Sequence, residues 1–410
     1  MRNRPEILAP AGDFEKMQYA IAYGADAVYL AGSSFGMRAA AGNFAMEELR
    51  EAVAYAHARG VKCYITVNII PSNRDLETLP SFLSFLQDEA QADALIVADV
   101  GVLALAKRYA PRLAVHISTQ TSILNYAAAN YWADQGAERI VLARELHLDE
   151  ISEIRAKTPP SLEIEAFVHG AMCISYSGRC LISQYLTGRD ANHGACAQPC
   201  RWKYQLVEEK RPGEYFPVVE DDRGTYLYNS KDLCMIGHIP ELITAGVDSF
   251  KIEGRNKTAY YAASVTSAYR RAVDALYTEP HVLPKDLFDE IDKVSHRNYY
   301  TGFYFGKEEN GQYYEDSQYI RDWEVIGLLD EADGEGHAVF RLKNRFYPGD
   351  TLELMQPGQE PYRFTADQVT DDEGTLLEVV HHPEMRFHLD FPFVVKPFAI
   401  LRHEKARAQG

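Results

Sequence analysis

The sequence predicts an α/β protein: a TIM-type (β/α)8 barrel followed by a small C-terminal all-β barrel domain. Two observations favour the first part. Eight short apolar runs alternate with amphipathic helical patterns over the first 280 residues, and strands that alternate with helices pair in parallel. Five of these runs directly follow a helix-to-strand turn such as "YGADA" or "AGVD". The alternative is an open doubly wound sheet, but no run is followed by a glycine-rich dinucleotide turn.

Each predicted strand is a short apolar run that ends in small or polar residues. The eight runs cover 6–12, 25–32, 61–68, 92–99, 113–120, 138–145, 163–170 and 248–255. Apolar residues at helical spacing predict helices between them, one of which covers 47–60 and stops at Gly60. The other predicted helices cover 80–90, 101–110, 126–136, 148–157 and 257–276. Eight such units are typical of a TIM-type barrel.

The chain divides into three parts. Residues 1–278 form the predicted barrel, with a cysteine-rich insertion at 170–231 after the seventh strand. Residues 279–320 read as a linker or packing segment with two early prolines, and its aromatic stretch is expected to pack on the barrel rather than to stack on RNA. Short strands separated by Gly, Asp and Pro predict the small β-barrel domain at 321–405.

Composition is that of a globular protein, with 46% apolar and 25% charged residues. No signal peptide and no apolar run of membrane-spanning length is apparent, so we expect a cytoplasmic protein with no membrane partner. The net charge of −17 argues against a general nucleic-acid or membrane-surface binder. The cysteine-rich stretch is locally positive instead. Its charged residues between 170 and 204 are Arg179, Arg189, Arg201 and Lys203 against Asp190.

Polar residues collect where the predicted strands end, which is the catalytic face of such a barrel. His116, Ser118 and Gln120 alternate, so they would share one face of the fifth strand. The set is expected to line a pocket, although some members could instead cap helices. The remaining members are Asn68, Asp99, Arg144, Glu145, His169, Glu253 and Arg255.

Four of the six cysteines fall within the predicted insertion. Cys173, Cys180, Cys196 and Cys200 are spaced C-x6-C-x15-C-x3-C, without the tight C-x2-C pairs that zinc sites favour. This spacing favours an iron–sulfur cluster, with zinc and unligated thiols as alternatives. Cys63 is expected to be a core residue. Cys234 is expected to open the next helix and is a weak fifth candidate ligand.

The stretch "EAFVHGAMCISYSGRCLIS" at 165–183 resembles the pattern of the U32 peptidase family. The resemblance continues through "GACAQPCRW", "YLYNSKDL" and "SFKIEGRNKT". The matching positions of the first stretch are Glu165, Phe167, Gly170, Cys173, Gly178, Cys180 and Ser183. Within this family the chain is most similar to a tRNA-hydroxylating branch. That branch takes part in making 5-hydroxyuridine at the wobble position, and its sister branches hydroxylate ribosomal RNA or the ubiquinone ring.

The resemblance implies a prephenate-dependent, oxygen-independent hydroxylation of tRNA. Prephenate would be the hydroxyl-donor co-substrate. The resemblance also implies that Cys173, Cys180, Cys196 and Cys200 bind a [4Fe–4S] cluster, a cluster type that spacing alone does not give.

Roles for the other residues follow from their chemistry. His169 is the favoured general acid or base, and His116, Gln120, Glu145 and Glu253 are the further catalytic candidates. Arg144 or Arg255 could hold a carboxylate of prephenate. Tyr176 and Trp202 flank the thiols and could stack on the wobble base or shield the cluster.

Two other functions stay open. A metal-dependent, collagenase-like peptidase would fit the family name, but the sequence has no H-E-x-x-H or G-x-S-x-G motif. The chain could also be a non-catalytic, cluster-bearing RNA-binding partner of a paralogous U32 subunit.

Overall fold

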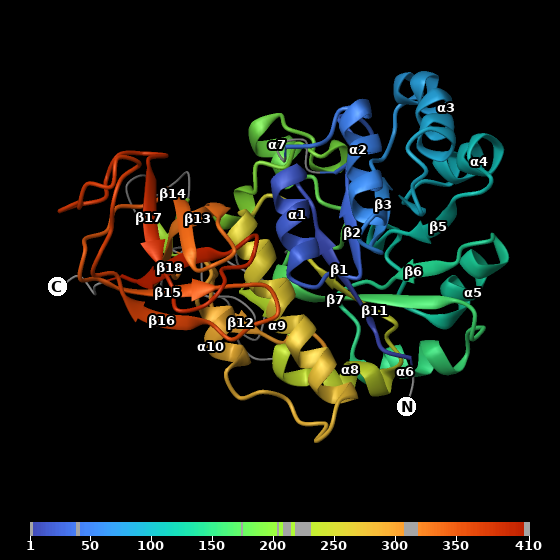
Figure 1. The fold of residues 1–410 in the computed structure, drawn as a ribbon. Helices are drawn as coiled ribbons and strands as arrows, with labels where there is room; N and C mark the ends of the chain where they lie inside the picture. Colours follow the sequence, from blue (N-terminus) through green and yellow to red (C-terminus); the bar gives the residue numbers. More distant parts are fainter. Residues whose placement is uncertain are drawn as a thin grey trace.

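The computed structural model describes residues 3–37, 42–173, 175–202, 205–207, 215–217, 231–306 and 319–405. Its N-terminal part is a closed barrel of eight parallel strands (Figure 1). Strand β1 pairs with both β2 and β11, and β11 also pairs with β7, which closes the ring. The predicted TIM-type barrel is therefore confirmed. The eight strands are β1 (Glu6–Pro10), β2 (Ala27–Leu30), β3 (Lys62–Val67), β4 (Ala94–Val97), β5 (Ala114–Ile117), β6 (Arg139–Val141), β7 (Glu163–Ala171) and β11 (Ser249–Ile252).

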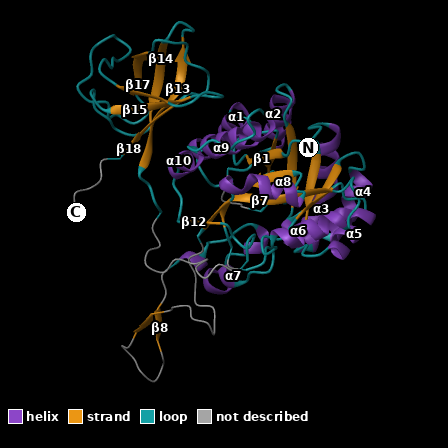
Figure 2. Ribbon diagram, turned by 90° about the horizontal axis from the view of Figure 1, so that it is seen from below, coloured by secondary structure: helices purple, strands orange, loops and turns teal. Residues whose placement is uncertain are grey.

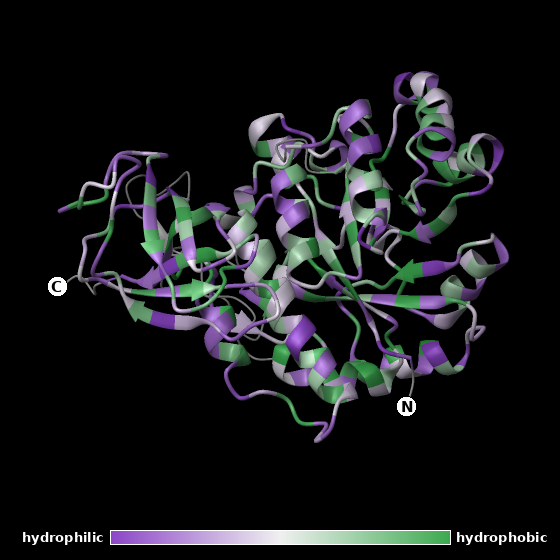
Figure 3. Cartoon of the chain, viewed as in Figure 1, coloured by the Kyte–Doolittle hydropathy of each residue, from purple (hydrophilic) through white to green (hydrophobic). Residues whose placement is uncertain are grey.

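Helices surround the barrel and turn their apolar faces toward the strands (Figure 3). Several begin at side-chain caps: Asp13 accepts a hydrogen bond from the Lys16 amide, and Thr258 accepts one from the Tyr261 amide. The helix predicted at 80–90 begins seven residues earlier, after Ser72, and carries Pro80 inside it. The helices are α1 (Phe14–Ala22), α2 (Met46–His57), α3 (Asn73–Asp88), α4 (Val100–Tyr109), α5 (Tyr126–Asp134), α6 (Leu148–Ala156), α8 (Ile239–Ala245) and α9 (Ala259–Tyr277).

The insertion leaves the barrel at the end of β7. It contains the short helix α7 (Ile182–Thr187) and the β8–β9 hairpin (Gln205–Val207 and Tyr215–Pro217; Figure 2). The chain returns through β10 (Asp232–Cys234), which pairs antiparallel with the end of β7. Cys234 therefore lies in a strand rather than opening a helix. It is 3% exposed, and burial raises its thiol pKa to about 12, which argues against its being a ligand.

The segment after α9 has more structure than a linker. Helix α10 (Leu287–Asp292) packs on α9, and β12 (Tyr299–Tyr300) extends the sheet beside β10. The Tyr304 hydroxyl is buried and donates to the Phe167 carbonyl oxygen at 2.6 Å. The aromatic stretch therefore packs on the barrel through residue 306, as predicted, while its remainder lies outside the described residues.

The C-terminal domain is a six-stranded antiparallel sheet with a core that includes Phe340, Phe346 and Phe387. Its strand order is β16-β15-β18-β13-β14-β17, and no pairing of β16 with β17 is found in the described part of the chain. The domain is thus an antiparallel half-barrel sheet, which confirms the small C-terminal all-β domain that the sequence predicted. Its strands are β13 (Trp323–Ala332), β14 (His337–Leu342), β15 (Thr351–Met355), β16 (Tyr362–Thr365), β17 (Arg386–Asp390) and β18 (Ile400–Glu404).

Buried contacts fix this domain against the barrel. The Tyr23 hydroxyl of α1 lies within hydrogen-bond distance of the Met355 and Phe398 carbonyl oxygens, at 3.1 and 3.0 Å. Arg402 has no exposed surface and bridges Glu290 of α10 (2.7 Å) to Glu353 of β15 (2.6 Å). Because a buried charge needs its partners, these ion pairs hold the two domains in one arrangement.

Within the described ranges, no helix has the length and apolar character needed to cross a lipid bilayer.

Candidate functional site

The cysteine segment, residues 171–202, lies over the carboxyl-terminal mouth of the barrel. The Asn192 carbonyl oxygen accepts a hydrogen bond from the Ile70 amide in the loop after β3 (3.2 Å). Gly178 packs against Gln120, in the loop after β5. Arg144, after β6, donates from Nη1 to the Ala171 carbonyl oxygen at 2.7 Å. The segment is therefore attached to the loops of three strands at the end where barrel enzymes carry out chemistry.

Gly170 lets the chain turn from β7 into this segment. Its φ of +109° is a conformation that residues with a Cβ rarely adopt. A Cβ at this position would also run into the Glu253 carbonyl oxygen. The glycine is thus required both by the backbone conformation and by the close approach of the chain after β11.

The four predicted ligand cysteines all lie in the cysteine segment. Cys173 is exposed, and Cys180, Cys196 and Cys200 are half-buried. None of the six cysteines, all of them in the described ranges, forms a disulfide. The two remaining thiols, Cys63 and Cys234, are buried in the barrel, so only the clustered four are accessible.

The four cysteine thiols are donors of the type that an iron–sulfur cluster requires. Four thiols are present, separated by turns, and the Gln198 amide donates to the Cys196 sulfur at 3.4 Å. Hydrogen bonds to sulfur are one way in which a protein tunes such clusters. Across the described residues, however, no three Cys, His, Asp or Glu side chains converge as a metal site, and this includes the four thiols. The four thiols have the chemistry and the location that an iron–sulfur cluster requires. In the described structure, however, they do not converge into a set of ligands.

Gln120 belongs to a small hydrogen-bond network at the mouth. The Ser118 hydroxyl donates to Gln120 Oε1 (3.0 Å), and Gln120 Nε2 donates to the Asn68 carbonyl oxygen (2.6 Å). Gln120 lies in a 3-10 turn after β5 rather than in the predicted strand. Its amide joins the loops after β3 and β5, which suits a positioning role better than direct chemistry.

Arg144 and Glu145 are neighbours in the loop after β6, close to Tyr300. The Arg144 guanidinium stacks over the Phe167 ring at 3.8 Å. Glu145 is half-buried, and this burial raises the pKa of its carboxyl group. A cation and a carboxyl group that holds its proton more tightly than usual are thus placed together at the mouth.

Glu253 and Arg255 follow β11, as predicted, but differ in access. Glu253 is half-buried, and its Oε2 lies 3.3 Å from the Tyr29 hydroxyl, whose shorter hydrogen bond goes to the Ile252 carbonyl oxygen (2.9 Å). Arg255 is only 3% exposed, and its carbonyl group lies against Gly12. Glu253 can therefore meet a substrate, whereas Arg255 could hold a carboxylate only after rearrangement.

His169 does not face the mouth. A β-bulge between Lys251 and Ile252 shifts the register of β11 against β7 at this point and interrupts the alternation along β7. The ring is 1% exposed and packs among Tyr261 and Tyr269 of α9 and Tyr299 of β12, with centroids 5.3 to 5.9 Å away. Burial lowers its pKa to about 3, with smaller contributions from His296 and Lys257. A neutral, enclosed imidazole argues against the predicted acid–base role.

His116 is likewise enclosed, but inside the barrel. Its ring lies edge-on to Tyr64, with centroids 4.6 Å apart, and it is 4% exposed. Burial, reinforced by Arg139 and Lys251, holds its pKa well below the usual range. The sequence correctly places His116 on an inward-facing strand position, but the residue lies too deep to meet a substrate at the mouth.

The largest group that the sequence reasoning missed is a buried ion network inside the barrel. Arg139 contacts Glu6 (2.5 Å) and Glu165 (3.1 Å), and Lys251 contacts the other oxygen of Glu165 at 2.6 Å. Glu165 and Lys251 are charged residues within apolar strand runs, which is the signal that could have revealed a buried pair.

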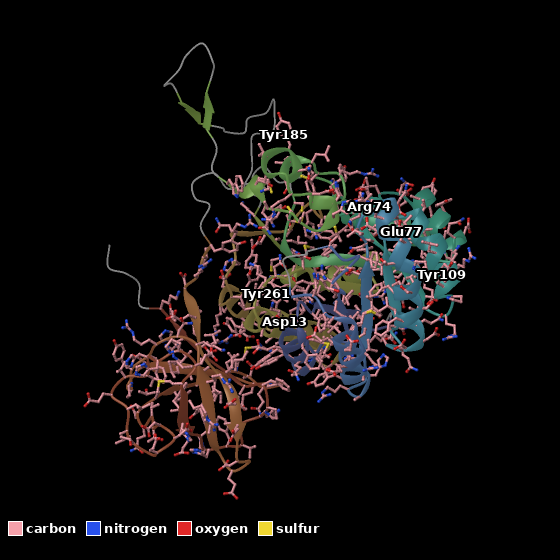
Figure 4. The ribbon with its side chains drawn as sticks, turned by 90° about the horizontal axis from the view of Figure 1, so that it is seen from above. Asp13, Arg74, Glu77, Tyr109, Tyr185 and Tyr261 are labelled. Atoms are coloured by element: carbon pink, nitrogen blue, oxygen red, sulfur yellow. The ribbon has the colours of Figure 1, made fainter. Side chains whose placement is uncertain are left out.

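Tyr176 and Trp202 are 43% and 48% exposed, as base stacking would require. Tyr185 of α7, 88% exposed, adds a third accessible ring on this segment (Figure 4). These aromatic side chains offer apolar faces to the solvent on the segment that carries the thiols.

The sequence profile of peptidase family U32 matches residues 12–313, and that of the peptidase family U32 C-terminal domain matches residues 321–402. The chain belongs to the U32 family. It is 39% identical over 395 residues to tRNA hydroxylation protein P1 of Bacillus subtilis, covering 94% of this chain and 92% of that protein. It is 37% identical over 424 residues to tRNA hydroxylation protein P of Escherichia coli, covering 92% and 91%.

A third relative in the U32 comparison has an RNA-modifying name. The 23S rRNA 5-hydroxycytidine C2501 synthase of Escherichia coli is 40% identical over 277 residues, covering 68% of this chain and 40% of that protein. Family members with names that specify RNA hydroxylation thus include proteins named for transfer RNA and for ribosomal RNA.

Proposed function

We propose that this U32 protein is an RNA-modifying enzyme that hydroxylates C5 of the wobble uridine in tRNA. The main support for this proposal is the segment that bears four accessible thiols and covers the barrel mouth. Near-complete alignment with two proteins named for tRNA hydroxylation supports the substrate class. Prephenate is the proposed hydroxyl donor, and the reaction needs no molecular oxygen.

Cys173, Cys180, Cys196 and Cys200 are the proposed ligands of a [4Fe–4S] cluster. When bound, such a cluster supplies one-electron redox chemistry at the mouth. The cysteine segment would be drawn together by the cluster, because metal binding and the ordering of its ligands are coupled. Cys63 and Cys234 stay buried in the barrel and take no part.

The other roles move from the enclosed histidines to the residues that remain accessible. Arg144 is the proposed partner of a prephenate carboxylate, because its guanidinium lies at the mouth and can form paired hydrogen bonds. Glu145 is the proposed proton-transfer group, because burial raises the pKa of its carboxyl group beside that arginine. Glu253 is the second carboxyl candidate and lies beside the Tyr29 hydroxyl.

The target base would be presented from a single-stranded loop. Unpaired RNA bases are recognised by stacking on aromatic side chains, and Tyr176 and Trp202 offer exposed rings on the cysteine segment. The anticodon loop supplies such a base without unpairing a helix.

The test uses the full chain purified without oxygen and reconstituted with iron and sulfide. The protein is incubated with unmodified tRNA and prephenate, and the tRNA nucleosides are then measured by mass spectrometry. We expect 5-hydroxyuridine only when prephenate is present, and equally in the absence of oxygen. Glu145→Gln should reduce the initial rate about 10²-fold or more, whereas Glu150→Gln, on the exposed side of α6, should leave it unchanged.

Two results would contradict this proposal. Chelator-sensitive turnover of a collagen-derived peptide, with no nucleoside product, would favour the metal-dependent peptidase. If the protein binds tRNA tightly but forms product only after a paralogous U32 subunit is added, the non-catalytic partner function would be favoured.

A further inference from the structure

A large cleft lies between the barrel and the C-terminal domain. It measures about 890 Å³ and reaches from Glu253 and Ala171 at the barrel mouth to Trp323 and Arg321 at the start of β13. Gln198 of the cysteine segment, two residues from both Cys196 and Cys200, lines the same cleft. The cleft therefore joins the thiol-bearing segment to the C-terminal domain.

A second cleft, of about 520 Å³, continues along the C-terminal domain. Trp323 and Lys405 line both clefts, so the two form one surface. Both basic and aromatic side chains line this surface. We define the basic track as Arg321, Trp323, Arg345, Tyr347, Arg363 and Lys405.

The arginines of the basic track are not needed for internal ion pairs. Arg321, Arg345 and Arg363 are exposed, and none of them pairs with an acidic group in the described part of the chain. Several other arginines do pair with acids, such as Arg270 with Asp26 (2.9 Å) and Arg402 with Glu353. Three exposed arginines without an acidic partner thus lie on one surface of a chain whose net charge is −17.

Two of the acids that line the same clefts already have basic partners. Glu353 contacts buried Arg402 (2.6 Å) and Lys293 (2.9 Å). Glu324 contacts His403 at 3.0 Å and Lys405 at 3.5 Å. These ion pairs offset part of the negative charge along the surface, to which Glu15, Glu253, Asp350 and Glu404 also contribute.

We propose that the basic track binds the backbone of the RNA substrate and guides its single-stranded loop toward the cysteine segment. This inference rests on the proposed function. Arginines interleaved with accessible rings match a chain of phosphates interleaved with bases. Tyr347 is 47% exposed, and Arg345 lies over its ring at 5.6 Å, so one phosphate contact and one stacking contact are adjacent. An acidic protein partner would have no bases to stack on the exposed rings.

The proposal resolves how a strongly acidic protein could bind tRNA. Repulsion from the other faces would disfavour non-specific contacts, and the basic track would set the orientation in which RNA approaches. The same cleft then leads to Gln198 and the thiols, where the target base has to be placed.

The test is fluorescence anisotropy of labelled tRNA with the reconstituted full chain across a salt series. The variant is Arg321→Glu/Arg345→Glu/Arg363→Glu. The matched control is Arg50→Glu/Lys107→Glu/Arg108→Glu, which reverses three exposed charges on α2 and α4. Iron content and thermal unfolding should be the same for both variants and the parent, because all six residues are exposed.

We expect the basic-track variant to lose at least about tenfold in affinity and to reduce the slope of log K against log salt by about 2. The control should match the parent within about twofold. Tyr347→Ala should weaken binding by about five- to tenfold with no change of slope, because stacking releases no counterions.

Equal affinity of the parent and the basic-track variant would overturn the inference and leave the proposed function standing. If the variant instead loses binding to poly-L-glutamate but keeps normal tRNA affinity, the surface is a protein-docking face and the RNA assignment is wrong. A parent protein without any RNA affinity would overturn the inference, and 5-hydroxyuridine production by the same preparation would show separately whether the proposed function also fails.

Discussion

The two ends of the barrel are built in opposite ways from the same eight strands. At the amino-terminal end, charged groups are buried and paired: Glu6, Arg139, Glu165 and Lys251 satisfy one another within about 3 Å. At the carboxyl-terminal end, the chain places accessible groups, namely the thiols, Arg144, Glu145 and Glu253.

This difference separates charges that hold the fold from charges that are available for chemistry. A buried, fully partnered ion pair costs desolvation energy and mainly specifies one arrangement of the strands. A half-buried carboxyl group with a raised pKa can exchange protons with a substrate instead. The thiols and Glu145 are among the groups available for chemistry. His116 is buried with the groups that hold the fold, although histidine often acts as an acid or a base.

The largest expected effect comes from breaking the paired end. Glu165→Gln leaves Arg139 and Lys251 buried without their shared carboxylate, and should lower the free energy of unfolding by about 3–5 kcal/mol. Glu163→Gln removes a carboxylate that pairs with the same arginine but is half-exposed, and should cost about 1 kcal/mol or less. Urea unfolding at pH 7 measures both, and equal losses would show that burial does not separate these two carboxylates.

The next effect concerns the junction between β7 and the cysteine segment. Gly170→Ala places a Cβ against the Glu253 carbonyl group at a φ of +109°, and should cost roughly 3 kcal/mol. Gly188→Ala, at a φ of +70° with open space around it, should cost only about 1 kcal/mol. Thermal unfolding of the pair tests this, and the prediction fails if Gly188→Ala is the more damaging change.

Acid should destabilise the protein through its buried histidines. The folded-state pKa of His169 is about 3, below the unfolded value of about 6.5. Between these values the unfolded chain binds a proton that the folded chain does not, so stability falls as the pH drops through this window. The slope is about 1.4 kcal/mol per pH unit for each such group. Between pH 4.5 and 7, the free energy of unfolding of the parent should fall more steeply with decreasing pH than that of His169→Phe, and the two slopes should differ by this amount. Parallel curves would contradict the buried placement of His169.

The smallest effect is expected at neutral pH for the same substitution. His169→Phe keeps the ring among Tyr261, Tyr269 and Tyr299 and removes a buried nitrogen, Nδ1, that has no partner in the described residues. Stability should change by about 1 kcal/mol or less, and hydroxylation should be retained. A rate loss of about 10²-fold or more, in a protein of normal stability, would restore His169 as an acid or base.

Strand order and barrel closure could be predicted because they follow from local patterns. All eight strands alternate with helices, and their apolar runs mark them individually. The catalytic end could also be predicted, since it follows from the parallel arrangement alone.

Side-chain direction could not be predicted where one extra residue changes it. His169 follows Glu165 and Phe167 at alternate positions, so a regular strand would point it inward, and the bulge opposite Ile252 leaves no mark in the sequence. The depth of His116 depends on the stagger between strands, which a single strand does not encode. Pairing of Glu165 with Lys251 spans 86 residues, beyond what spacing can indicate.

The most direct measurement is 5-hydroxyuridine in total tRNA from a strain that lacks this gene and carries one variant at a time. The account predicts that Cys173→Ser, Cys180→Ser, Cys196→Ser and Cys200→Ser each fail to restore the nucleoside, while Cys63→Ser restores it as the parent does. Equal restoration by the parent and all four clustered variants would contradict the claim that the thiols at the barrel mouth carry the chemistry.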